Sequence, residues 1–169
     1  MLFKKKILEA IKNKENKDIF IIGKGPSVDG IDLKILKNKI VININNSEKI
    51  FPGDIALFHD NWVLDDLKKS GFDANLYISN LTLPKEINQI KADYISHNPE
   101  SSDFIMERFF ENKFYLEQFS IISALSLAEE ISRALEIKKN VYLLGFDLNA
   151  DAGFSQSFNS PINLDENYQ

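Results

Sequence analysis

The chain has 169 residues, of which 44% are hydrophobic and 27% are charged, and its formal net charge is −5. This length and balance indicate one globular domain with a single core and exclude a mainly disordered chain. The negative charge argues against a general nucleic-acid binder, and the absence of cysteine excludes disulfides and thiolate chemistry. Only His59 and His97 are present as histidines, so a metal site with several histidine ligands is not expected.

No apolar run reaches the roughly 18 residues of a membrane-spanning helix, and the N-terminal segment lacks the apolar core of an export signal. We therefore expect a cytoplasmic protein without a transmembrane segment. Residues 1–40 hold ten lysines against five acidic residues, and no Lys or Arg follows Lys139. A basic N-terminal part suits an anionic small ligand, although a solvated helix face is the simpler explanation for the lysines at positions 4–6.

The first two elements are an amphipathic helix and a buried strand. Phe3, Ile7 and Ile11 stand four residues apart with lysines between them, which predicts a helix over residues 2–14. The apolar run 19–22 predicts a strand, and it breaks abruptly into the turn Gly23-Lys24-Gly25-Pro26-Ser27.

The turn after the first strand is a candidate anion site. We expect Gly23 and Gly25 to adopt positive φ and to let the backbone approach a ligand closely, while Pro26 fixes the turn. Ser27 can cap the following segment or bond a phosphate directly. An ordinary strand-to-loop turn remains an equally good interpretation, because this spacing is neither the dinucleotide fingerprint nor a Walker loop.

Polar residues follow the next two predicted strands at the point where each strand ends. Asp32 can cap a short helical piece before the strand at 39–44, which runs into Asn45, Asn46 and Ser47. The strand at 54–58 ends in His59-Asp60-Asn61, and a helix is expected from there to residue 69.

The second half of the chain is less regular, except for one helix and one strand. Short strands are expected at 76–79 and 94–97, and a helix at 104–110. The clearest helix is 120–137, with Ser120 as N-cap and one apolar stripe formed by Ile121, Leu125, Ala128, Ile131 and Leu135. A buried strand at 139–144 then ends in Gly145-Phe146-Asp147. Because periodicity stops at Asn149, we expect a nucleotide-binding domain over 1–154 and a polar tail over 155–169 that marks the boundary of a longer protein.

The alternation of strands and helices predicts a three-layer, Rossmann-like α/β fold with a parallel sheet. In such a sheet a ligand crevice lies beyond the carboxyl ends of the strands. The candidate binding residues at these ends are Gly23, Lys24, Gly25, Pro26, Ser27, Asn45, Asn46, Asp60 and Asp147. Backbone N–H groups suit a phosphate, and asparagine amides suit base and ribose edges, so the pocket fits a nucleotide.

Two acidic residues of this set, and the histidine next to one of them, each have more than one candidate role. Asp60 and Asp147 could hold a divalent cation, cap a helix or bond a ribose hydroxyl. His59 is the candidate catalytic residue, as a general base, and its alternative role is to orient the ligand.

These motifs, in this order, resemble the bacterial sialyltransferases of glycosyltransferase family 42. They resemble equally the related group of motility accessory factors and archaeal hydroxymethylpterin pyrophosphokinases. The resemblance rests on Ile21-Ile22-Gly23-Lys24-Gly25-Pro26-Ser27, Asn45-Asn46, the stretches 54–60 and 123–128, and Val141-Tyr142-Leu143-Leu144-Gly145-Phe146-Asp147, so it spans residues 19–154.

The sialyltransferase resemblance implies a GT-A-like domain that binds CMP-sialic acid or a related CMP-linked sugar without a required metal. It implies a phosphate near Gly25 to Ser27, and Asn45 and Asp60 near the ribose or phosphate. Ser123 and Ala124 would take the place of the family's Ser-Gly at the nucleotide. The chain departs from the family at Ala124, and no histidine follows His97 to serve as the expected catalytic base.

We therefore expect a nucleotide-sugar-binding domain of glycosyltransferase type, from bacterial surface-glycan biosynthesis, with a glycan acceptor and little transfer by this chain alone. One alternative is an ATP- and Mg-dependent pyrophosphokinase in which Asp60 and Asp147 hold the metal. The other is a non-catalytic nucleotide-binding domain.

Overall fold

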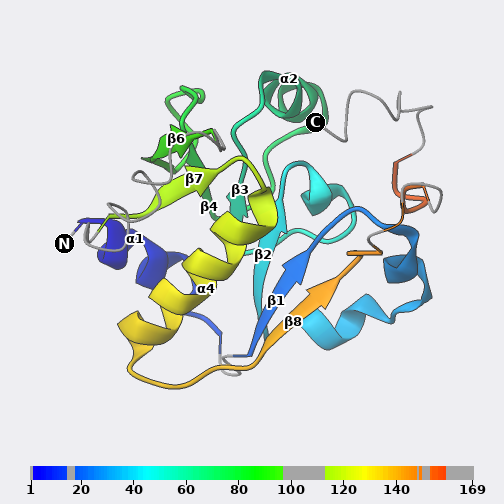
Figure 1. The fold of residues 1–169 in the computed structure, drawn as a ribbon, viewed down its shortest axis with the longest axis horizontal. Coiled ribbons are helices and arrows are strands. Elements are labelled where there is room, and N and C mark those ends of the chain that lie inside the picture. The colour runs from blue at the N-terminus through cyan, green and yellow to red at the C-terminus, as the bar shows by residue number, and fades with distance from the viewer. Residues whose placement is uncertain (1, 15–17, 97–112, 148, 150–152, 159–169) are drawn as a thin grey trace.

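The computed structural model describes residues 2–14, 18–96, 113–147, 149 and 153–158 (Figure 1). The first half contains α1 (Leu2–Ala10), β1 (Ile19–Ile22), η1 (Pro26–Gly30), η2 (Leu33–Leu36), β2 (Ile40–Ile44), η3 (Ser47–Lys49), β3 (Ile55–Leu57) and α2 (Asn61–Ser70), where η denotes a 3₁₀ helix. The second half contains β4 (Leu76–Ser79), β5 (Gln89–Lys91), β6 (Asp93–Ile95), β7 (Tyr115–Glu117), α4 (Ser120–Leu135) and β8 (Val141–Leu144).

Six parallel strands form the central sheet in the order β5-β4-β3-β2-β1-β8 (Figure 1). The strand order runs outward from β1 to β5 and then returns to the other side of β1, where β8 pairs with it. This reversal is the switch point at which α/β sheets commonly bind ligands. A separate parallel pair is formed by β6 and β7.

The sheet lies between two layers, and the predicted three-layer α/β fold is confirmed. Alternate residues of β1 point to opposite faces, as a strand requires. Ile19 and Ile21 join the main core with α1 and α4, whereas Phe20 and Ile22 pack with Leu36 of η2. On that second face, α2 covers β3 and β4 through a further cluster that includes Phe58 and Tyr77.

Helix α4 faces the core with a different stripe from the predicted one. Its buried residues are Ser123, Ala124, Leu127, Ala128 and Ile131. Leu125 is 43% exposed, so its place in the expected stripe was wrong. Ser123, Ala124 and Ala128 are small, and small side chains allow a helix to lie close to a sheet.

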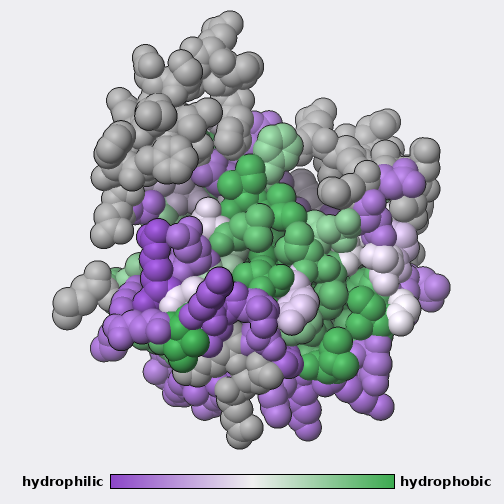
Figure 2. All heavy atoms as spheres, turned by 60° about the horizontal axis from the view of Figure 1, so that its bottom comes forward, coloured by the Kyte–Doolittle hydropathy of each residue, from purple (hydrophilic) through white to green (hydrophobic). Residues whose placement is uncertain are grey.

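Strand β8 was expected to be buried, and this expectation was also wrong. It lies at the edge of the sheet, and its residues Val141, Tyr142 and Leu143 are exposed. Tyr142 stacks on Phe20 of the neighbouring strand with ring centroids 4.7 Å apart. Figure 2 shows a broad apolar area on one face of the molecule. Exposed hydrophobic residues of β8 and α4 contribute to it.

Several predicted boundaries need correction. The first helix ends at Ala10, and turns occupy the positions up to Asn13. The strand expected at 94–97 is Asp93–Ile95. Its partner β7 was not predicted. Strand β5 was not predicted either, because it has a single isoleucine between Gln89 and Lys91. These strands have three residues each, too few for a periodic pattern. The expected helix at 104–110 lies outside the described residues.

No helix within the described ranges is long and apolar enough to cross a membrane.

Candidate functional site

The turn after β1 needs its glycines for close packing and not for positive φ. Gly25 has a φ of −66°, and Gly23 is not among the residues with positive φ, so that part of the prediction was wrong. A Cβ on Gly23 would lie 2.5 Å from the Gly145 carbonyl oxygen. A Cβ on Gly25 would lie 1.7 Å from Oδ2 of Asp147. In the facing loop, Gly145 does adopt positive φ, at 70°.

The backbone N–H groups of this turn bind the loop that follows β8. Gly23 N donates to the Leu144 oxygen at 2.8 Å, and Gly25 N donates to the Gly145 oxygen at 2.8 Å. Ser27 N donates to Asp147 Oδ2 at 3.3 Å. We call these two segments, 23–27 and 145–147, the β1–β8 junction. An external phosphate at Ser27 would have to displace a carboxylate of the protein itself.

Residues at the start of the expected polar tail also pack on this turn. Ser155 is buried, and its N–H donates to the Lys24 carbonyl oxygen at 2.8 Å. Its hydroxyl bonds the Asp29 carboxylate, which also accepts from Gln156 N at 3.0 Å. The described residues 155–158 therefore belong to the same packed unit as the glycine turn.

The side chain of Lys24 lies among aromatic rings at the carboxyl end of β1. Its ammonium is 4.5 Å from the centroid of Trp62, 4.9 Å from that of Phe154 and 5.8 Å from that of Phe158. Burial lowers the pKa of Lys24 to about 8, against the opposing charges of Asp66 and Asp60. An anionic ligand beside Lys24 would favour its protonated form.

The carboxylate of Asp66 in α2 accepts hydrogen bonds from two side chains of the loop after β2. Asn46 Nδ2 donates to Asp66 at 2.7 Å, and Lys49 forms an ion pair with the same carboxylate. Burial raises the pKa of Asp66, but these two hydrogen bonds, together with the positive charges of Lys49 and Lys69, outweigh it and hold the pKa below its usual range. The carbonyl Oδ1 of Asn46 is buried and has no hydrogen-bond partner among the described residues. Asn46 is thus mainly a link between β2 and α2.

Polar groups that follow β2, that follow β3 and that lie at the start of α4 meet beyond the carboxyl ends of β2 and β3. Asn45 has a left-handed backbone, with φ of 55°, a conformation that asparagine tolerates. Its Oδ1 accepts from the hydroxyl of Ser120 at 3.4 Å, at the start of α4. His59 Nε2 lies 3.2 Å from the Gln118 carbonyl oxygen. We call Asn45, His59, Asp60, Gln118 and Ser120 the β2–β3–α4 edge.

Ser120 and Ser123 have different roles from those expected. Ser120 is the first residue of α4, and Phe119 occupies the N-cap position without a side-chain hydrogen bond. Ser123 is fully buried, and its Oγ accepts a hydrogen bond from Glu117 N at 2.7 Å. This hydroxyl ties α4 to β7.

The imidazole of His59 is held from both sides. Its Nδ1 lies 3.2 Å from Asp60 Oδ1, and its ring centroid lies 4.5 Å from that of Tyr94 with the two rings tilted by 34°. Both ring nitrogens therefore face oxygen atoms of the protein. In this arrangement both ring nitrogens of His59 are engaged, so the ring can reach an acceptor hydroxyl only after it leaves Asp60 or Gln118.

Sequence reasoning missed four residues that shape the site, namely Trp62, Phe154, Gln118 and Ser120. Trp62 is the only tryptophan and stands just after a strand's carboxyl end, which was a usable signal. Phe154, Gln118 and Ser120 are brought in by contacts between distant segments, for which the local pattern carries no signal.

Within the described part of the chain, no group of three or more His, Cys, Asp or Glu residues could hold a metal ion. Comparisons with protein-family models, with curated proteins and with solved structures gave no match.

Proposed function

We propose that this domain binds a nucleotide sugar of the CMP-linked type at the β2–β3–α4 edge, as a glycosyltransferase-type domain of cytoplasmic surface-glycan biosynthesis. The observation that carries the proposal is the meeting of Asn45, His59 and the start of α4 at one edge of an all-parallel sheet. Ligands of α/β sheets bind beyond the carboxyl ends of the strands, where these groups lie.

The edge offers several donors for the phosphate of such a ligand. The N-terminus of the 16-residue helix α4 carries partial positive charge and exposes backbone N–H groups. Asn45 Nδ2 has no acceptor among the described residues, and the His59 ring lies beside it at the same edge. Lys24 adds a cation on the β1 side, and Trp62 adds a flat apolar surface beside it. The phosphate belongs at α4 in this proposal, because Asp147 already fills the position at Ser27.

In sugar transfer, an acceptor hydroxyl attacks the anomeric carbon, the bond from that carbon to the phosphate oxygen breaks, and the nucleoside monophosphate leaves with the electron pair. A base must take the hydroxyl proton, which contributes roughly 10²- to 10⁴-fold to the rate. His59 is engaged by Asp60 and Gln118 and is better placed to orient the phosphate. We therefore expect binding with little or no transfer from this chain alone.

A thermal-shift screen tests the proposal with CMP, CMP-sialic acid, CTP, UDP and ATP, each with and without Mg²⁺. Ligands stabilise the folded state by RT ln(1 + [L]/Kd), so CMP compounds should raise Tm without the metal. The proposal fails if no nucleotide raises Tm. Stabilisation by ATP only with Mg²⁺ would instead favour the pyrophosphokinase-type function.

Two variants locate the binding. Asn45→Ala should weaken CMP about tenfold by removing a donor at the phosphate, while Asn38→Ala, at an exposed asparagine outside the edge, should not. Equal CMP affinity in the parent and Asn45→Ala would remove the β2–β3–α4 edge as the binding site.

A further inference from the structure

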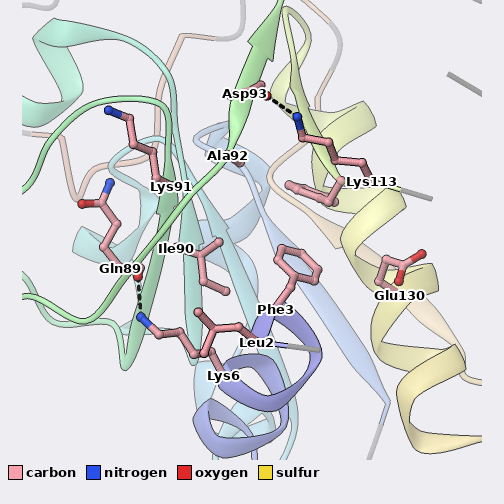
Figure 3. Close-up of a pocket in the computed structure, with 11 residues that line it drawn as sticks. Leu2, Phe3, Lys6, Gln89, Ile90, Lys91, Ala92, Asp93, Lys113 and Glu130 are labelled. Atoms are coloured by element: carbon pink, nitrogen blue, oxygen red, sulfur yellow. Dashed lines mark hydrogen bonds and ion pairs between the residues drawn. The ribbon is translucent and has the colours of Figure 1, made fainter. Parts of the chain in front are cut away.

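A separate cavity of about 410 Å³ lies beside α1 and β5, and Figure 3 shows it in close-up. Its lining includes Phe3, Lys6, Ile90, Asp93, Phe114 and Glu130, none of which belongs to the β2–β3–α4 edge or the β1–β8 junction. We call it the α1–β5 cavity. Its volume falls within the range of small-molecule sites.

The floor of the α1–β5 cavity is apolar. Phe3, Ile90 and Phe114 are partly buried and pack against the main core, and the rings of Phe3 and Phe114 stack at 5.3 Å. Successive side chains of a strand point to opposite faces of the sheet, so in β5 Ile90 faces the cavity and Gln89 and Lys91 face the opposite side. There the Gln89 side chain bonds the backbone of Leu81 and Leu83. The apolar groups thus form a continuous surface that a hydrophobic body can cover.

One end of the cavity carries an incompletely satisfied ammonium. Lys6 Nζ donates to the Gln89 carbonyl oxygen at 2.6 Å. An ammonium has three donors, and the other two have no acceptor among the described residues. Figure 3 shows Lys6 at one end, with Asp93 and its partner Lys113 at the other. Glu130 lies on α4 and pairs with Arg133 at 3.2 Å.

The charges fix the orientation and the class of ligand. A negative group fits at Lys6, where donors remain, whereas at the other end the Lys113 ammonium is already paired with Asp93 and the Glu130 carboxylate disfavours a second negative charge. We propose that the α1–β5 cavity binds a small molecule with an apolar body on Phe3, Ile90 and Phe114 and a single anionic head group at Lys6. The proposal does not depend on nucleotide binding. A carboxylate and a phosphate monoester share this chemistry.

Isothermal titration calorimetry of the whole chain tests the proposal with four probes below their micelle-forming concentrations: sodium decanoate, decyl phosphate, 1-decanol and decyltrimethylammonium. We expect at least one anionic probe to bind tenfold or more tightly than decanol, and the cationic probe not to bind. Tighter decanoate would identify a carboxylate ligand, and tighter decyl phosphate a phosphate monoester. The proposal is overturned if neither anion binds, or if decanol or the cation binds as tightly as both anions.

Two matched pairs of variants locate the binding. Lys6→Met should reduce anion affinity about tenfold and leave decanol affinity unchanged, whereas Lys5→Met, on the exposed side of α1, should stay within twofold of the parent. Ile90→Trp fills the cavity and should abolish binding of every probe, while Ile35→Trp adds the same ring at an exposed site and should not. Circular dichroism checks that each variant is folded, and CMP binding, measured separately, is expected to be unchanged. Unchanged anion affinity in folded Lys6→Met or Ile90→Trp would overturn the proposal.

Discussion

The β1–β8 junction and the β2–β3–α4 edge both lie beyond the carboxyl ends of parallel strands, but they differ in how their polar groups are used. At the junction, backbone N–H groups of the glycine turn bind Leu144, Gly145 and Asp147, so the turn is closed by the protein itself. At the edge, Asn45 and the start of α4 meet through a single 3.4 Å contact. Glycines after a strand can therefore serve the packing of one segment of the chain against another, and we propose the neighbouring β2–β3–α4 edge as the ligand site.

The largest expected effect concerns the junction. Gly25→Ala should destabilise the fold by about 1–3 kcal/mol, because its Cβ would meet Asp147 Oδ2 at 1.7 Å and the Gly145 oxygen at 2.8 Å. Gly30→Ala is the control, since a Cβ there meets nothing within 4 Å, and it should stay within about 0.5 kcal/mol. Urea denaturation measures both.

A double variant sharpens this test. In an Asp147→Ala background, Gly25→Ala should cost less than in the parent, because its closest contact is gone. An equal cost in both backgrounds would show that the approach of Asp147 is not what demands glycine at position 25.

A somewhat smaller effect is expected at Ser123, which was predicted as a nucleotide contact. Ser123→Ala leaves the buried Glu117 N–H without its acceptor and should destabilise the chain by about 1–2 kcal/mol without changing CMP affinity. Ser126→Ala, at an exposed position of the same helix, should change neither quantity. A loss of CMP binding in folded Ser123→Ala would return this residue to the site.

The pH dependence of CMP binding tests Lys24, whose pKa is lowered to about 8 by burial. If its protonated form attracts the phosphate, CMP affinity should fall as pH rises above 8, by at most tenfold per pH unit. Lys24→Met should bind more weakly at pH 7 and lose this dependence, while Lys34→Met, at an exposed lysine, should retain it. A parent affinity that stays flat from pH 7 to 9.5 would contradict a role for this ammonium.

Lys24 also affects stability, with a defined sign. Its pKa in the folded chain lies below the ordinary value of 10.5, so the unfolded chain binds more protons between pH 8 and 10.5. Its contribution to the free energy of unfolding therefore increases across this window, and Lys24→Met should remove that increase.

The smallest effect is expected for the Asp66 carboxylate. The pKa of Asp66 in the folded chain lies below its pKa in the unfolded chain. Its contribution to the free energy of unfolding is therefore present above the unfolded-state pKa and is lost as the pH falls through the folded-state pKa. Asp66 is partly exposed, so Asp66→Asn should cost no more than about 1 kcal/mol at neutral pH and flatten the acid side of the stability curve. An unchanged acid limb would contradict the contribution of its hydrogen bonds to Asn46 and Lys49.

The fold could be predicted because strands β1 to β4 and β8 are short apolar runs separated by helical or turn signals. The positions of Asn45, His59 and Asp60 after strand ends followed from the same pattern. The role of Gly25 could not be predicted, because it depends on the nearby carboxylate of Asp147. This carboxylate accepts a hydrogen bond from Ser27, which is 120 residues away in the sequence. The contacts of Gln118 and Ser120 similarly depend on how α4 is placed on the sheet.

A ¹H–¹⁵N NMR titration of the chain with CMP tests the central claim most directly, because it compares the two regions in one experiment. We expect the largest amide shifts at Asn45, His59, Ser120 and Ile121, with smaller shifts at Gly25 and Ser27. Shifts confined to residues 23–27 would place the phosphate at the glycine turn, and no shift at saturating CMP would mean that neither region binds the nucleotide. Either result would contradict the account.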